Sequence, residues 1–129
     1  MPKRKETKLV LSDIKILVTI EELNRINRYP TSVGVFKILS GSQEGEYLQY
    51  EEILTYNTLT SLSPKQISRK ISFLIRHEFI QKIYHPSSLE EYLQITDRGS
   101  RALNDFFQTH KSTFKRKVIT KKIEIIEIR

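Results

Sequence analysis

The sequence predicts an α+β fold that is mainly helical, in which several helices are followed by a β-hairpin and a final helix. Three observations predict it: apolar residues at helical spacing in the first half, a capped basic helix starting at Ser63, and two β-rich segments, 79–84 and 91–95. A Pro-Ser-Ser sequence between these segments favours a turn. A basic helix followed by a hairpin and another helix is the outline of a helix-turn-helix with a β-wing.

The first helix is expected over about 13–27, where apolar residues recur at nearly helical spacing and Ser12 or Asp13 can cap the start. The apolar run 16–20 is also compatible with a strand. Pro30 ends this segment, because a proline disfavours α geometry in the residue before it.

A second helix is expected after Thr31 or Ser32, either of which can cap it, and Gly41 ends it. A polar loop over 41–46 is expected next, then a helix at about 49–56 and a turn at 57–62.

The strongest local signal lies at Ser63-Pro64-Lys65-Gln66, which places a cap, a proline at the first helical position and a glutamine that can reach back to the cap. At 100° per residue this helix, 63–77, has one apolar and one basic side. The apolar side holds Ile67, Ile71, Leu74 and Ile75, and the opposite side holds Lys65, Arg69, Ser72 and Arg76. Residues 63–77 contain no acidic residue, whereas solvated helix faces usually mix both signs.

After the hairpin, Thr96 or Asp97 is expected to cap a helix over about 97–110. The last residues are β-branched and basic, and they are compatible with a strand, a helical extension or disorder. The chain is therefore divided into a basic N-terminal tail (1–12), a winged-helix domain with its N-terminal helix (13–110) and an isoleucine-rich basic C-terminal extension (111–129).

Positive charge is concentrated in particular parts of the chain. The net charge is +7; residues 1–8 carry four basic and one acidic residue (+3), and residues 111–129 carry seven and two (+5), which leaves −1 for 9–110. A focused basic surface is what phosphate binding requires, although basic tails also serve solubility alone.

Several function classes are disfavoured by composition. The chain has no cysteine and its three histidines are far apart, so neither a zinc site nor another metal or cofactor is expected. The adjacent pairs Glu51-Glu52 and Glu90-Glu91 diverge on a helix or strand, so neither suits acid–base chemistry, and no enzyme activity is expected. With no signal peptide or membrane-length apolar run, a cytoplasmic location is expected.

Three segments resemble winged helix-turn-helix regulators of the MarR and PadR kind: 62–71 is similar to their recognition helix, 74–82 to their passage into the wing, and 92–99 to their exit from it. The resemblance implies a DNA-binding protein that reads the major groove. One departure is the expected wing tip, 85–91, which has no Lys or Arg and ends in Glu90 and Glu91, whose charge repels phosphate.

The predicted function is that of a sequence-specific transcriptional regulator that binds double-stranded DNA as a homodimer. The predicted DNA-contacting residues lie on the basic helix and at the wing tip: Ser63, Lys65, Gln66, Arg69, Lys70, Ser72, Phe73, Arg76, Ser87 and Ser88. Gln66 can read adenine or be used for capping, Lys70 lies toward the side of the helix, and Phe73 can instead pack on the wing. The alternative is a winged-helix module that binds protein or RNA.

Tyrosines cluster near the second helix, at Tyr47, Tyr50 and Tyr56. They can line a small-molecule pocket for an effector, or they can be half-buried core residues.

Overall fold

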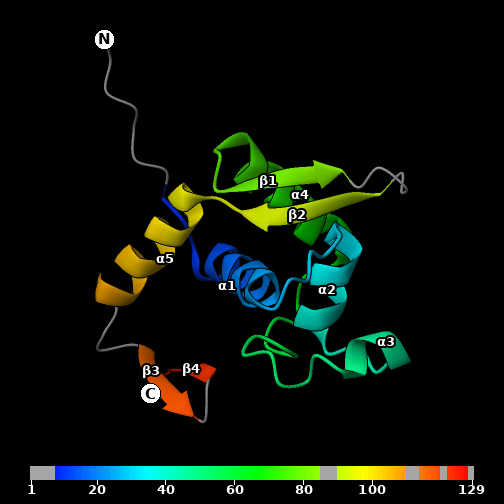
Figure 1. Ribbon diagram of the computed structural model, residues 1–129, viewed down its shortest axis with the longest axis horizontal. Helices are drawn as coiled ribbons and strands as arrows, with labels where there is room; N and C mark the ends of the chain where they lie inside the picture. The colour runs from blue at the N-terminus through cyan, green and yellow to red at the C-terminus, as the bar shows by residue number, and fades with distance from the viewer. Residues whose placement is uncertain (1–7, 85–89, 110–113, 120–121, 128–129) are drawn as a thin grey trace.

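The computed structural model describes residues 8–84, 90–109, 114–119 and 122–127, and the remaining parts of the predicted tails lie outside these ranges. The elements follow one another along the chain as shown in Figure 1. They are α1 (Leu11–Arg25), α2 (Ser32–Ser40), α3 (Gly45–Leu48), α4 (Pro64–Arg76), β1 (Ile80–Tyr84), β2 (Glu91–Ile95), α5 (Asp97–Thr109), β3 (Phe114–Ile119) and β4 (Lys122–Glu127). The α+β, mainly helical winged-helix fold is thereby confirmed.

Helix α1 runs through the middle of the domain (Figure 1) and supplies much of the core. Ile16, Leu17 and Ile20 are fully buried, so the run 16–20 is helical and not a strand. The predicted cap was wrong: Val10 is the N-cap, and Asp13 is the third helical residue, whose carboxylate accepts a 3.0 Å hydrogen bond from the Val10 N–H. The helix also ends earlier than predicted, at Arg25.

Helix α2 forms as predicted, because Thr31 Oγ1 accepts the Gly34 N–H at 3.1 Å and Gly41 closes the helix in the left-handed region at φ 75°. A glycine is needed at this C-cap because other residues adopt that conformation only with strain.

The predicted helix over 49–56 is not formed. The backbone instead makes successive turns in which the N–H of one residue reaches back three positions, as from Ile53 to Tyr50. Ile53 and Thr55 are both buried, although residues two apart point about 200° away from each other on a helix. The Thr55 hydroxyl bonds to that of Thr19 on α1, and the Glu22 carboxylate accepts the backbone N–H of Leu54 at 3.2 Å. These contacts to α1 hold the segment in turns.

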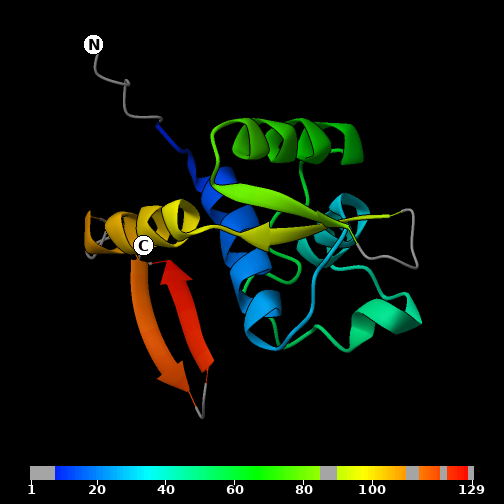
Figure 2. The same ribbon diagram turned by 45° about the horizontal axis from the view of Figure 1, so that its top comes forward.

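The hairpin confirms the predicted wing, with β1 and β2 antiparallel in a register that pairs Ile80 with Ile95 and Tyr84 with Glu91. Ile80 and Leu93 point into the core. The outer edge of β2 is joined to the loop before α2, because the Leu93 N–H donates to the Pro30 carbonyl at 2.8 Å. In Figure 2, α4 lies above this hairpin and α3 lies below it.

Helix α5 follows the wing directly, and its buried Leu103 and Phe107 close the core against α1. Beyond it, β3 and β4 pair antiparallel, with Phe114 opposite Glu127. The sequence was compatible with a strand, a helical extension or disorder in the C-terminal segment, and the described residues there form strands.

Candidate nucleic-acid interface

Helix α4 begins at a complete capping box. Ser63 Oγ accepts the Gln66 N–H at 3.2 Å, and Gln66 Oε1 accepts the Ser63 N–H at 2.8 Å, with Pro64 at the first helical position. The box satisfies backbone donors that the helix cannot pair internally, which stabilises the helix start by about 1 kcal/mol. It fixes where α4 starts and therefore the direction of its faces.

The inner face of α4 is anchored in the core by Ile67, Ile71 and Leu74, which are at most 1% exposed. The opposite face, called here the α4 basic face, consists of Lys65, Arg69, Ser72 and Arg76, all exposed. The amphipathic division predicted from the sequence is thus observed.

The cations of the α4 basic face are not held by ion pairs within the described part of the chain. No described residue forms an ion pair with Lys65, Arg69 or Arg76. Their guanidinium and ammonium groups are therefore available to phosphate oxygens or to the acceptor edge of guanine.

Gln66 is occupied by its capping role. A bidentate contact with adenine uses both the amide oxygen and the amide nitrogen, but Gln66 Oε1 already accepts the Ser63 N–H. While the box is intact, only Nε2 is left to donate.

Lys70 and Phe73 are half-buried at the sides of α4. Lys70 Nζ lies 3.5 Å from the carboxylate of Asp13, which is 4% exposed. Phe73 packs against the core, and its ring centroid lies 4.5 Å from that of His77, so the aromatic ring contacts its own helix end. Within the domain, Lys70 thus forms an ion pair and Phe73 packs against the core.

The wing carries internal pairs on its exposed surface. Lys82 Nζ lies 2.9 Å from Glu91, and this hydrogen bond raises the pKa of Lys82. Glu91 is therefore partly neutralised, whereas the sequence alone left it as an unpaired repulsive charge. Ser87 and Ser88, predicted to contact phosphate, lie outside the described residues.

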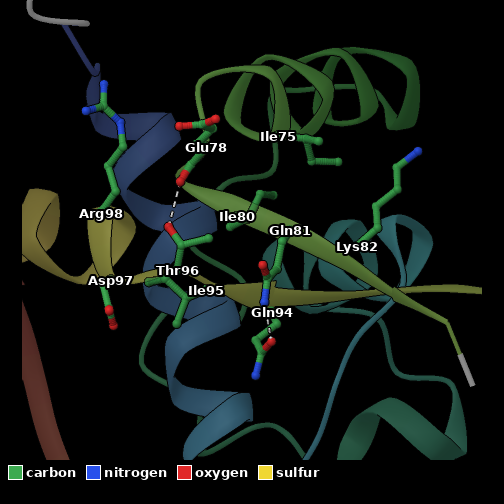
Figure 3. A pocket seen from close by; sticks show the side chains of 10 residues that line it. All are labelled: Ile75, Glu78, Ile80, Gln81, Lys82, Gln94, Ile95, Thr96, Asp97 and Arg98. Carbon is green, nitrogen blue, oxygen red and sulfur yellow. Dashed lines mark hydrogen bonds between the residues drawn. The ribbon is translucent and has the colours of Figure 1, made fainter.

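The wing root is fastened to the end of α4 and the start of α5. Thr96 Oγ1 donates to the Glu78 carbonyl at 2.6 Å (Figure 3). It also accepts the Gly99 N–H at 3.1 Å, so Thr96, of the two predicted candidates, is the α5 cap. A Cβ at Gly99 would lie 2.2 Å from the Phe79 carbonyl oxygen, so only glycine allows this approach. The Thr-Asp-x-Gly sequence therefore sets the position of the wing relative to α4.

A shallow groove of about 780 Å³ lies at this junction (Figure 3). Its charged lining residues are Lys82 and Arg98, at opposite ends, and the carboxylates Glu78 and Asp97. The two signs balance, so the groove does not extend the positive potential of the α4 basic face.

Among the described residues, no three His, Asp or Glu side chains gather closely enough to hold a metal ion. In the same part of the chain, no helix combines the length and apolar character that a bilayer crossing requires.

Capped α4, the β1–β2 wing and α5 together define a winged-helix domain. The RQC domain family matches residues 13–122, and the chain belongs to this family. RQC winged-helix domains, typically found in RecQ helicases, bind DNA. A search of curated proteins finds no match. The winged-helix part of the sequence resemblance is confirmed, while the match is to RQC and not to MarR or PadR regulators.

Proposed function

We propose that this chain is a sequence-specific, double-stranded DNA-binding transcriptional regulator that inserts α4 into the major groove. The observation that carries the proposal is the α4 basic face, whose Lys65, Arg69 and Arg76 are exposed and form no ion pair with a described residue. A helix presented on one side of a compact domain is the element that fits the major groove. Arg69 lies at the middle of this face, where its guanidinium can contact a phosphate or read a guanine.

We propose further that the chain binds as a homodimer, acts through binding rather than catalysis, and works in the cytoplasm. A single α4 reads only a few base pairs, and symmetric pairs of recognition helices double the contacted site. The dimer proposal predicts two half-sites in inverted orientation.

The test is selection of a binding motif from a randomised duplex pool at about 150 mM salt. The expected result is an inverted repeat with half-sites about 10 base pairs apart. A single non-repeated motif would refute the dimer but keep sequence-specific recognition. No enrichment, with binding that depends only on salt, would refute the regulator and leave a nonspecific DNA-binding domain.

The second candidate is a winged-helix module that binds a protein or RNA. The negative charge of Glu90 at the wing end favours it, since this charge repels a nearby phosphate, whereas Lys82 partly offsets the charge of Glu91. Duplex binding with a steep salt dependence would argue against a protein partner, because a protein–protein interface releases few counterions.

A further inference from the structure

A second cavity, of about 480 Å³, lies on the side of the wing away from α4. It is bounded by the loop between α1 and α2, by α3 with the turn after it, and by the start of β2. Figure 2 shows α3 and the end of the hairpin on this side. The volume falls in the range of small-molecule sites, which is about 300–1,000 Å³.

Four tyrosines line this cavity, which we call the tyrosine pocket: Tyr29, Tyr47, Tyr50 and Tyr92. They come from three segments, since Tyr47 and Tyr50 are neighbours in the sequence, and the fold brings Tyr29 and Tyr92 beside them. Tyr56, which the sequence grouped with Tyr47 and Tyr50, does not line the pocket, and its hydroxyl donates to the Ser42 carbonyl at 2.7 Å. Aromatic faces carry negative quadrupole charge and attract cations.

The charged groups around the tyrosine pocket are mainly acidic. Glu46 and Glu90 line it with one cation, Arg28, which gives a formal lining charge of −2 + 1 = −1. The Glu90 carboxylate accepts the Tyr92 hydroxyl at 3.0 Å, so this carboxylate is held against a pocket ring. A phosphate-bearing ligand is disfavoured here, in contrast to the α4 basic face.

One ring of the pocket already binds a cation within the protein. Lys37 Nζ lies 5.3 Å from the centroid of the Tyr47 ring. Burial, followed by the charge of Glu46, raises the pKa of Tyr47, whereas the charge of Lys37 lowers it. The Tyr47 ring is thus placed to contact a positively charged group.

We infer that the tyrosine pocket binds a small organic cation, an amine or quaternary ammonium compound with an aromatic or aliphatic body. The rings would contact the apolar body and the face of the cationic group, and Glu46 and Glu90 would supply the counter-charge. Neither the α4 basic face nor the RQC family match assigns this site. Because Glu90 and Tyr92 belong to the wing, the bound cation would contact the wing directly.

The test is a titration of the full chain with benzyltrimethylammonium in the absence of DNA. Binding is measured from the ¹H–¹⁵N chemical shifts of the protein. The matched uncharged compound is 2,2-dimethyl-3-phenylpropan-1-ol, which has nearly the same shape. Saturable shifts are expected at residues 28–34 and 46–50, with the cation binding at least five-fold more tightly than the alcohol. Equal affinities would overturn the assignment to a cation, and shifts centred elsewhere would overturn the site.

Three variants separate pocket binding from general effects. Glu46→Gln is expected to weaken the cation at least three-fold without affecting the alcohol, whereas Glu51→Gln, exposed and outside the pocket lining, leaves both unchanged. Gly34→Leu is expected to abolish binding of both compounds by filling the cavity. A Cβ at Gly34 meets only ordinary contacts, the closest at 3.5 Å to Thr31 Oγ1, and Gly34→Ala checks that the backbone tolerates substitution.

Unchanged cation binding in both Glu46→Gln and Gly34→Leu would overturn the inference. Because these titrations contain no DNA, their outcome is independent of whether the α4 basic face binds a duplex.

Discussion

Replacing Arg69 by Gln is expected to lower the salt dependence of duplex binding by a predictable amount. Each phosphate contact contributes about 0.9 to the slope of log K against log salt, so the loss of one contact reduces the slope by about 0.9. The wild-type protein should bind more tightly than the variant at 50 mM salt. When the salt is raised four-fold to 200 mM, the ratio of the two association constants should fall by about 3.5-fold.

The α4 basic face contains three exposed cations that pair with no described residue: Lys65, Arg69 and Arg76. Removing all three should lower the slope by about 2.7 and change the same ratio by about 40-fold. Fluorescence anisotropy of a labelled duplex at several salt concentrations measures both quantities.

Arg25→Gln is the matched control, because Arg25 lies on the last turn of α1 and pairs with Glu21 at 3.2 Å. It removes the same charge but should change the slope by less than about 0.2. Equal slope changes for the Arg25 and Arg69 variants would refute a localised interface, since only net charge would then matter. If Arg69 reads a base, its variant also loses about 1–3 kcal/mol on the selected motif but not on a scrambled duplex.

Three further predictions concern the stability of the interface scaffold, measured by urea unfolding. Gly99→Ala should lower the free energy of unfolding by about 3 kcal/mol, because the added Cβ would overlap a backbone carbonyl. The control, Gly45→Ala, has open space around the added Cβ and should cause no comparable loss. Similar losses for the two variants would contradict the close approach at Gly99. Lys70→Met should cost about 1 kcal/mol by leaving the buried carboxylate of Asp13 without its ion-pair partner, and the loss should largely vanish in an Asp13→Asn background. Ser63→Ala should cost about 1 kcal/mol through the lost cap, and an unchanged stability would show that the capping box contributes nothing.

Elements fixed by local chemistry were predictable from the sequence. The Ser63-Pro64-Gln66 start of α4 and the cap at Thr96 use side chains that bond to backbone within three residues, so their sequence carries the whole signal. The hairpin is similarly set by two short β-rich runs and the turn residues between them.

Features fixed by contacts between distant residues were not predictable. Ser12 or Asp13 was expected to cap α1, but Asp13 is the third helical residue and accepts the Val10 N–H. Nothing local in the sequence indicates its ion pair with Lys70, 57 positions away. The segment 49–56 has a helical composition, yet hydrogen bonds from Thr55 and Leu54 to α1 hold it in turns. The sequence grouped Tyr47 and Tyr50 as candidate pocket residues, but no pattern in it places Tyr29 and Tyr92 beside them.

The fastening of the wing root has a consequence for how the domain meets a curved or bent duplex. Thr96 donates to the Glu78 and Phe79 carbonyls, and the absence of a side chain at Gly99 lets α5 pack closely against the same backbone. These contacts fix the angle between α4 and the wing. A duplex that touches both elements must adopt the groove width and curvature that this angle dictates. The energy needed to deform each sequence would then contribute to selectivity at base pairs that no side chain reaches.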